Sequence, residues 1–241
     1  MTLGGGWRGP RAAGTLLRAF LARRGVIETP LLGASRRELD LIRETRSQVP
    51  LLLCDAAALQ ILTCVRAAAR LGGAMAEAGV LMGGSARLIC EAKGDAPLHL
   101  FDTFELLQSP PRDGAGADEA ELRSHFGSVH GRRDAVDRLL AAYASVHVHA
   151  GIFPATAEKV AEERFAFVHL DLDLVRFTRE ALAFFRPRML PGGIIVGDDY
   201  DDPGVRETFR ACFAGRGDSY FELPWGQVMI ACQPETKIVS G

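Results

Sequence analysis

The sequence predicts an α/β fold in which a mostly parallel sheet is covered by helices on both faces. Three observations predict it. From Gly73 onward, short apolar runs alternate with amphipathic segments, which is the pattern of strand–helix–strand units. A turn at residues 224–226 separates the last two apolar runs, so the sheet should end in an antiparallel hairpin. The chain has 241 residues, 48% hydrophobic and 24% charged, which is enough apolar material for a sizeable core.

The N-terminal region, residues 1–72, is expected to form a helical cap. Leucine and alanine recur three and four positions apart within it, and Pro30 and Pro50 interrupt this helical pattern. Residues 73–241 form the second region, which carries the sheet. We expect the two regions to pack as one compact unit.

Strands and helices alternate from residue 73 onward. The predicted parallel strands lie at residues 74–80, 98–101, 146–149, 165–170 and 193–197. Predicted helices between them include residues 119–125, 134–143 and 179–185. The closing hairpin is predicted at residues 220–223 and 228–232. Because parallel strands all end at one edge of a sheet, residues that follow these runs should gather there.

Composition and charge exclude several classes of protein. Lys and Arg number 28 against 30 Asp and Glu, so there is no basic excess for holding a nucleic-acid backbone. No run approaches the ~18 apolar residues that span a bilayer. Five cysteines without a C-x-x-C pair predict neither a disulfide framework nor a zinc site. The sequence therefore predicts a cytoplasmic protein that binds neither nucleic acid nor membrane, and it leaves a homo-oligomer open.

A glycine-rich turn follows the first predicted strand. Gly79, Gly83 and Gly84 let the backbone turn sharply and approach a ligand, and Ser85 is expected to cap the next helix. Asp102 ends the second strand, where a carboxylate can accept both hydroxyls of an adenosine ribose. The turn matches neither the dinucleotide nor the P-loop fingerprint, so a plain tight turn is the alternative. The pairing with Asp102 favours a nucleoside-type ligand.

Carboxylates follow two further strands. Asp171 and Asp173 end the fourth parallel strand, and Asp198 and Asp199 end the fifth. If these strands are neighbours ~4.8 Å apart, the acids converge at the ligand-binding edge, where they repel one another unless a cation is bound. Oxygen ligands favour Mg²⁺, and after it Mn²⁺ or Ca²⁺. The alternative is a solvated acidic turn.

The histidines are assigned smaller roles. His147 and His149 alternate along one strand and could in principle chelate a metal, and His169 lies on another strand. We interpret all three as hydrogen-bonded core residues and leave them out of the metal site. His125 and His130 flank a loop and are candidates for proton transfer.

Four blocks of the chain carry motifs. They are E-A-G-V-L-M-G-G-S-A at 77–86, F-D-T-F-E at 101–105, G-I-F-P-A-T at 151–156, and H-L-D-L-D-L at 169–174 with P-G-G at 191–193 and D-D-Y at 198–200. Across roughly residues 73–232, these blocks resemble the macrocin O-methyltransferase (TylF-like) family of class I S-adenosylmethionine-dependent methyltransferases. Val175 and Leu106 depart from the family's usual Tyr and Gly, and both departures bear on the identity of the acceptor.

The resemblance implies a seven-stranded Rossmann-like sheet with its last strand antiparallel and an N-terminal helical cap. It implies S-adenosylmethionine and Mg²⁺ as cofactors, and methyl transfer to a hydroxyl of a small molecule, often a sugar of a natural product. The cofactor positions that it implies are Glu77, Gly79, Ser85, Asp102, Thr103, Gly151 and Phe153. The metal positions that it implies are Asp171, Asp198 and Asp199, with Asp171 also the catalytic base.

Two other functions stay open from the sequence. A nicotinamide-dependent oxidoreductase would use a similar sheet, although the missing G-x-G-x-x-G and the terminal hairpin weigh against it. A non-catalytic methyltransferase-like module would bind the cofactor without turnover, although the retained acids weigh against that reading.

Overall fold

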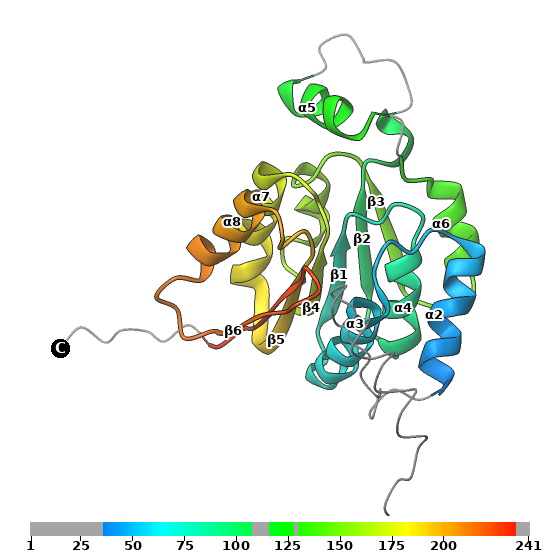
Figure 1. Ribbon diagram of the computed structural model, residues 1–241, viewed down its shortest axis with the longest axis horizontal. Coiled ribbons are helices and arrows are strands. Elements are labelled where there is room, and N and C mark those ends of the chain that lie inside the picture. Colours follow the sequence, from blue (N-terminus) through cyan, green and yellow to red (C-terminus); the bar gives the residue numbers. More distant parts are fainter. Residues whose placement is uncertain (1–35, 108–115, 128–129, 235–241) are drawn as a thin grey trace, which may run out of the picture. The chain divides into compact units, whose positions relative to one another are not determined.

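A seven-stranded sheet runs through the computed structural model, which describes residues 36–107, 116–127 and 130–234 (Figure 1). Its strands are β1 (Ala74–Ala78), β2 (Leu98–Asp102), β3 (Val146–Ala150), β4 (Phe165–Leu170), β5 (Met189–Gly197), β6 (Ser219–Glu222) and β7 (Val228–Ala231). Their order across the sheet is β3-β2-β1-β4-β5-β7-β6, and β7 runs antiparallel to both of its neighbours. The predicted parallel sheet with a closing hairpin is confirmed.

The order of the strands reverses at β1. The chain steps outward from β1 to β2 and β3, and then returns to β4 on the other side of β1. Helices leave β1 and β4 toward opposite faces of the sheet, which opens a crevice above the carboxyl ends of these two strands. Open α/β sheets bind their ligands in this crevice.

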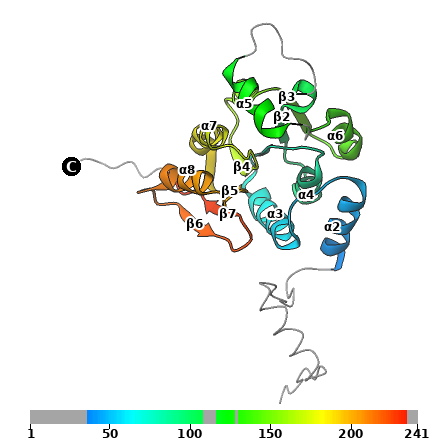
Figure 2. The same cartoon turned by 45° about the horizontal axis from the view of Figure 1, so that its top comes forward.

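Helices cover both faces of the sheet, as Figure 2 shows from above the strand ends. They are α2 (Arg36–Gln48), α3 (Asp55–Ala68), α4 (Gly84–Ala92), α5 (Ala117–Phe126), α6 (Arg133–Leu140), α7 (Val175–Phe185) and α8 (Pro203–Phe213). Short 3₁₀ helices are η1 (Ala69–Leu71), η2 (Phe104–Leu107), η3 (Ala155–Val160) and η4 (Arg186–Arg188). α5 lies beyond the strand ends, apart from the two helix layers (Figure 1).

Two apolar clusters hold the layers together. On one face, Leu62 of α3 and Ile89 of α4 pack in a cluster with Phe167 of β4. On the other face, the cluster includes Phe185 of α7 and Phe209 of α8. Full burial of a side chain of this size contributes about 1.5–3 kcal/mol. All six residues of β4 are buried, which explains the unbroken run predicted there, because a central parallel strand is covered on both faces.

The described part of the predicted cap region belongs to the unit that contains the sheet. Residues from Arg37 onward cluster as one compact unit, and α3 joins its core through Ile61 and Val65. Residues 1–35 of the cap region lie outside the described residues. Within the described ranges, the helices are too short or too polar to cross a membrane.

The structure corrects the predicted start of one strand. β5 begins at Met189 rather than at residue 193. Its pairing with β4 shifts between Phe165 and Phe167, so Pro191 and Gly192, which indicate a turn in the sequence, lie in an irregular part of the strand.

The structure also corrects the predicted helix cap. α4 begins at Gly84, and its N-cap is Gly83, which makes no side-chain hydrogen bond. Gly83 has a φ of +84°, a left-handed conformation that glycine adopts without a steric penalty. Ser85 therefore does not cap the helix but lies buried inside its first turn.

Replacing Gly79 by alanine is expected to lower the free energy of unfolding by about 3 kcal/mol, because two costs add. Gly79 has a φ of +90°, and a left-handed backbone costs an alanine about 1–2 kcal/mol. A Cβ there would also collide with the carbonyl oxygen of Asp171, and backbone shifts of this kind cost about 1–3 kcal/mol. Urea unfolding followed by circular dichroism measures the loss.

Gly94→Ala is the matched control. Gly94 also has a positive φ, of +62°, but no atom lies within 4 Å of the position that a Cβ would take. This variant should lose only the backbone cost of about 1–2 kcal/mol. Equal losses for the two variants would show that the contact between the ends of β1 and β4 tolerates a side chain.

Candidate functional site

A pocket of about 400 Å³ opens at the carboxyl ends of the parallel strands, where the strand order reverses. The residues predicted from the sequence that line it are Gly79, Asp102, Thr103, Gly151, Phe153, Asp171, Asp198 and Asp199. They follow β1, β2, β3, β4 and β5 in turn. The parallel sheet therefore brings together residues that are up to 120 positions apart in the sequence, from Gly79 to Asp199.

Asp102 holds the glycine-rich turn in place. Its Oδ2 accepts hydrogen bonds from the backbone N–H groups of Val80 and Leu81, both at 2.8 Å, and its Oδ1 accepts one from Phe104, also at 2.8 Å. A Cβ at Gly131 would lie 2.9 Å from the same Oδ1, so the chain packs closely around this carboxylate. Asp102 thus shapes the pocket, and its binding to a ribose stays a prediction.

Backbone strain is concentrated around the pocket. Leu81, Phe104, Asp173 and Asp199 have left-handed φ angles of 51°, 46°, 57° and 57°. Each such residue costs about 1–2 kcal/mol relative to an ordinary conformation. Strained residues of this kind cluster at functional sites, where the surrounding structure holds them in position.

The predicted acids converge at the ends of β4 and β5. Backbone hydrogen bonds continue the ladder beyond the strands, from Asp171 N to Ala78 O at 2.9 Å and from Asp198 N to Leu170 O at 2.8 Å. Ligand atoms of Asp171, Asp173 and Asp199 lie within 4.8 Å of one another. Those of Asp171, Asp198 and His169 form a second such group, so Asp171 is shared by both.

Crowding and burial favour the protonated forms of these acids. Burial, and next the neighbouring Asp198, raise the pKa of Asp171 well above its ordinary value. Burial together with Asp173 raises the pKa of Asp199 to about 6. The pKa of Asp173 is also raised, chiefly by burial, although His125 opposes the shift. Like charges this close are relieved by a cation, so this donor set fits a divalent metal ion.

His169 links the acids to the interior of the sheet. Its Nδ1 lies 2.8 Å from Oε1 of Glu77, and its Nε2 lies 3.2 Å from Oδ2 of Asp198. Burial alone would lower the pKa of His169, but hydrogen bonds to Asp198 and Glu77 raise it to about 10. His169 is therefore cationic at neutral pH and is a hydrogen-bonded core residue, as interpreted from the sequence.

Asp198 receives a second hydrogen bond to the same oxygen, from Nε2 of Gln227 at 3.0 Å. Gln227 is fully buried and precedes β7, so the closing hairpin takes part in orienting the acid. Both donors use Oδ2, which leaves Oδ1 of Asp198 for another partner.

Two of the predicted cofactor residues lie outside the pocket lining. Glu77 is fully buried beneath it, and among the described atoms its Oε2 has no hydrogen-bond partner. Ser85 is buried within α4. Both residues belong to the predicted motif, but the structure places Glu77 against His169 rather than at the surface of the pocket.

Several lining residues are apolar and were not predicted from the sequence. They are Leu52 and Leu53 between α2 and α3, Leu122 and Phe126 of α5, and Phe177 of α7. Leu52 is 80% exposed although it lines the pocket. The sequence carries no signal for them, because apolar residues on helices indicate only a buried face.

His125 and His130, the candidates for proton transfer, also line the pocket. The Nδ1 atom of His130 is buried and lacks a hydrogen-bond partner among the described atoms. This nitrogen is therefore available to a ligand in the pocket.

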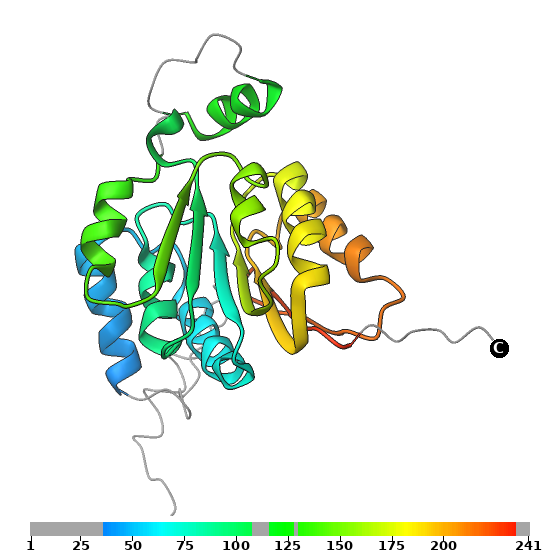
Figure 3. The same ribbon diagram turned by 180° about the vertical axis from the view of Figure 1, so that it is seen from behind.

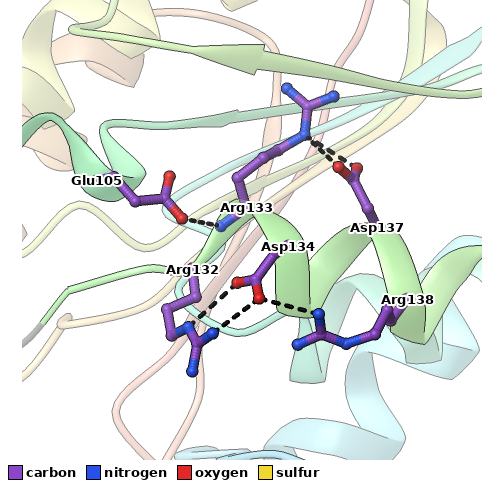
Figure 4. A network of polar contacts seen from close by, with 6 residues as sticks. All are labelled: Glu105, Arg132, Arg133, Asp134, Asp137 and Arg138. Carbon is purple, nitrogen blue, oxygen red and sulfur yellow. Dashed lines mark hydrogen bonds and ion pairs between the residues drawn. The ribbon is translucent and has the colours of Figure 1, made fainter.

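Polar contacts hold the rim of the pocket where α6 begins (Figure 4). Oε1 of Glu105 accepts a hydrogen bond from the backbone of Arg133 at 2.9 Å, and the backbone of Arg132 donates to Leu81 O at 3.1 Å. Asp134 pairs with both Arg132 and Arg138. Exposed ion pairs contribute only about 0–1 kcal/mol each, so the backbone hydrogen bonds fix this end of the helix.

Removing the imidazole of His169 should strongly destabilise the protein. His169→Leu leaves the buried carboxylate of Glu77 without its partner, and breaking a buried ion pair costs about 3–5 kcal/mol. The double variant Glu77→Leu with His169→Leu removes both groups and should recover most of that loss. Urea unfolding of both variants measures the difference, and a double variant no more stable than His169→Leu would contradict the pairing.

Comparisons with known proteins agree with this fold. A model of the macrocin-O-methyltransferase (TylF) family matches residues 57–216. An 8-demethyl-8-(2,3-dimethoxy-alpha-L-rhamnosyl)-tetracenomycin-C 4'-O-methyltransferase of Streptomyces olivaceus is 31% identical over 146 residues. That match covers 56% of this chain and 56% of the relative, so it spans little more than half the length of each.

Solved structures share the fold. The O-methyltransferase NovP is 23% identical with a TM-score of 0.58, over 73% of this chain and 79% of its own. A protein of Corynebacterium glutamicum is 13% identical with a TM-score of 0.60, over 94% and 100%. An O-methyltransferase of Bacillus cereus, solved with SAH, is 13% identical with a TM-score of 0.54, over 91% and 97%. The predicted class I methyltransferase fold is confirmed, and with the family model matching well over half of its length, the chain belongs to the macrocin O-methyltransferase (TylF) family.

Proposed function

We propose that the chain is an S-adenosylmethionine-dependent O-methyltransferase whose acceptor is a hydroxyl of a small molecule, with a sugar of a glycosylated natural product as the acceptor class. The observation that carries the proposal is the convergence of Asp171, Asp198 and Asp199 in a pocket at the reversal of strand order. Membership of the family supports the reaction, and the name of the Streptomyces olivaceus relative supports a sugar hydroxyl.

The pocket suits S-adenosylmethionine. Gly79 lines the pocket and has no side chain to obstruct a ligand there. Asp102 and Thr103 line the side where a ribose would bind, and Gly151 and Phe153 line the side proposed for the adenine. The buried and unpartnered Nδ1 of His130 lies in the same lining and suits a polar ligand.

The acid cluster suits Mg²⁺, with Mn²⁺ or Ca²⁺ as alternatives. Asp171, Asp198 and Asp199 would hold the ion through oxygen atoms, the ligands that such hard ions prefer. Ligand atoms of Asp171 lie within 4.8 Å of those of Asp198 in one group and of Asp199 in the other, so Asp198 and Asp199 would have to move closer to each other around the ion. When both are bound, S-adenosylmethionine supplies an electrophilic methyl group and the ion supplies a Lewis acid that lowers the pKa of the acceptor hydroxyl.

The side chains of this protein bind, orient and deprotonate the acceptor. Asp171 lines the pocket and would accept the hydroxyl proton at its carboxylate, which the positive charge of a bound ion would keep deprotonated until then. His169 and Gln227 hold Asp198 in one orientation from below. Leu52, Leu122 and Phe177 would keep water away from the acceptor and hold it near the donor, and such positioning supplies several kcal/mol of the barrier reduction.

Incubating the protein with labelled S-adenosylmethionine and a panel of sugar and phenolic acceptors tests the proposal. Transfer should require a divalent ion and should be lost in excess chelator, and normal turnover in the chelator would refute the metal role. Tight cofactor binding without transfer to any acceptor would indicate the non-catalytic module. Binding of NADH in place of S-adenosylmethionine would indicate the oxidoreductase.

Asp198→Ala is expected to lower the turnover rate at least about 100-fold, because a ligand of the proposed ion is lost. Binding of S-adenosylmethionine, measured by calorimetry, should persist because Asp102, Thr103 and Gly151 are unchanged. Asp201→Ala is the matched control, since Asp201 is an exposed acid of the same turn that does not line the pocket. Equal activity of the two variants would contradict the role of Asp198.

A further inference from the structure

Three histidines gather on β2 and β3, outside the pocket. His147 and His149 alternate along β3, so their side chains lie on the same face of the sheet. His99 of β2 is the register partner of His147. β3 is the edge strand of the sheet (Figure 3), and His147 on it is exposed. None of the three lines the pocket or has a role in the proposed methyl transfer.

The rings of this histidine cluster lie close together. The ring centroid of His99 is 5.1 Å from that of His147 and 5.3 Å from that of His149. Nδ1 of His99 lies 3.1 Å from Nε2 of His149. Two nitrogens bound to one tetrahedral Zn²⁺ at about 2.0–2.1 Å each are about 3.4 Å apart. The 3.1 Å contact is a hydrogen bond between the two rings, and an ion that replaced it would change the spacing of these nitrogens only slightly.

The contacts of His99 and His149 within the protein are mostly with aromatic rings. His99 is only 6% exposed, and among the described atoms its Nε2 has no hydrogen-bond partner. Its one polar contact is with His149, and aromatic rings surround the pair, with Phe101 stacked on His149 at 4.7 Å and Phe165 edge-on to His99 at 6.3 Å. Among the described contacts of His99 there is no carboxylate, so neither of its ring nitrogens is held in an ion pair.

Two of the three histidines, His99 and His149, have a lowered pKa. Burial, and next the neighbouring His149 and His147, lower the pKa of His99 to about 4. The pKa of His149 is also lowered, chiefly by burial and then by Lys159, His147 and Arg133. Neutral imidazole is the ligating species, so neither residue has to lose a proton at neutral pH.

We propose that His99, His147 and His149 form a binding site for a borderline divalent transition-metal ion such as Zn²⁺ or Ni²⁺. Two histidines two residues apart on one strand and a third on the adjacent strand can supply a three-nitrogen site with one open position. In the structure the three rings do not bring one nitrogen each within 4.8 Å of one another, so the exposed His147 must turn to complete the site. The site differs from the acid cluster in its ligands, since nitrogen favours these ions and carboxylate favours Mg²⁺.

A metal titration of the full chain tests the site. The protein is stripped of metal with chelator and titrated calorimetrically with Zn²⁺ at pH 7.5. The Asp198→Ala background weakens the acid cluster, and His147→Gln within that background separates binding by the histidines from binding that Asp171, Asp173 and Asp199 retain. We expect about one equivalent to bind in this background, and His147→Gln to weaken that binding at least 10-fold. His147 is exposed, so this substitution should leave the fold intact, as a circular dichroism spectrum would show.

Co²⁺ provides a second readout, because its visible absorption differs between nitrogen and oxygen ligands. The spectrum in the Asp198→Ala background should show nitrogen coordination and should lose it with His147→Gln. His125→Gln is the matched control, an exposed histidine of α5 outside the cluster, and should change neither result. Unchanged Zn²⁺ affinity in His147→Gln, or no Zn²⁺ binding in the Asp198→Ala background, would overturn the site and leave the proposed methyl transfer untouched.

Discussion

The buried hydrogen-bonded chain from Glu77 through His169 to Asp198 is the interaction on which the site depends. It crosses three adjacent strands, β1, β4 and β5, directly beneath the pocket. Glu77 and His169 are fully buried and Asp198 is partly buried, and these charges are stable here because a cationic His169 lies between two acids. The hydrogen-bonded chain therefore joins β1 to the acid that follows β5 and sets the orientation of Asp198.

The remainder of the site follows from the position of β1 and β4 at the centre of a parallel sheet. Their carboxyl ends approach so closely that Gly79 has no room for a side chain against Asp171. Asp102 then shapes the glycine-rich turn through three backbone hydrogen bonds. The strained conformations of Asp173 and Asp199 persist because the strands and helices around them are well packed. A rigid scaffold thus supports a crowded, like-charged site that would not form in a short peptide.

The two histidine-containing sites differ because their surroundings differ. His169 lies between carboxylates, which raise its pKa to about 10, whereas His99 has histidine and aromatic neighbours, which hold its pKa down to about 4. The same side chain is therefore a buried cation in one place and a neutral ligand in the other. Their roles follow from these partners and not from the strands that carry them.

Periodicity and motifs in the sequence alone determined the strands, the closing hairpin, the family and the acids that line the pocket. These signals are local, because the apolar run of β4 and the Asp-Asp pair after β5 can each be recognised within a few residues of sequence. Only the tertiary structure decided that Gly83 rather than Ser85 begins α4, that Glu77 pairs with His169, and that Leu52 and Phe126 line the pocket. The hydrophobic pattern of the sequence shows that a side chain is buried. It does not show which side chain lies beside it, because that partner comes from a distant segment and depends on the order of the strands in the sheet.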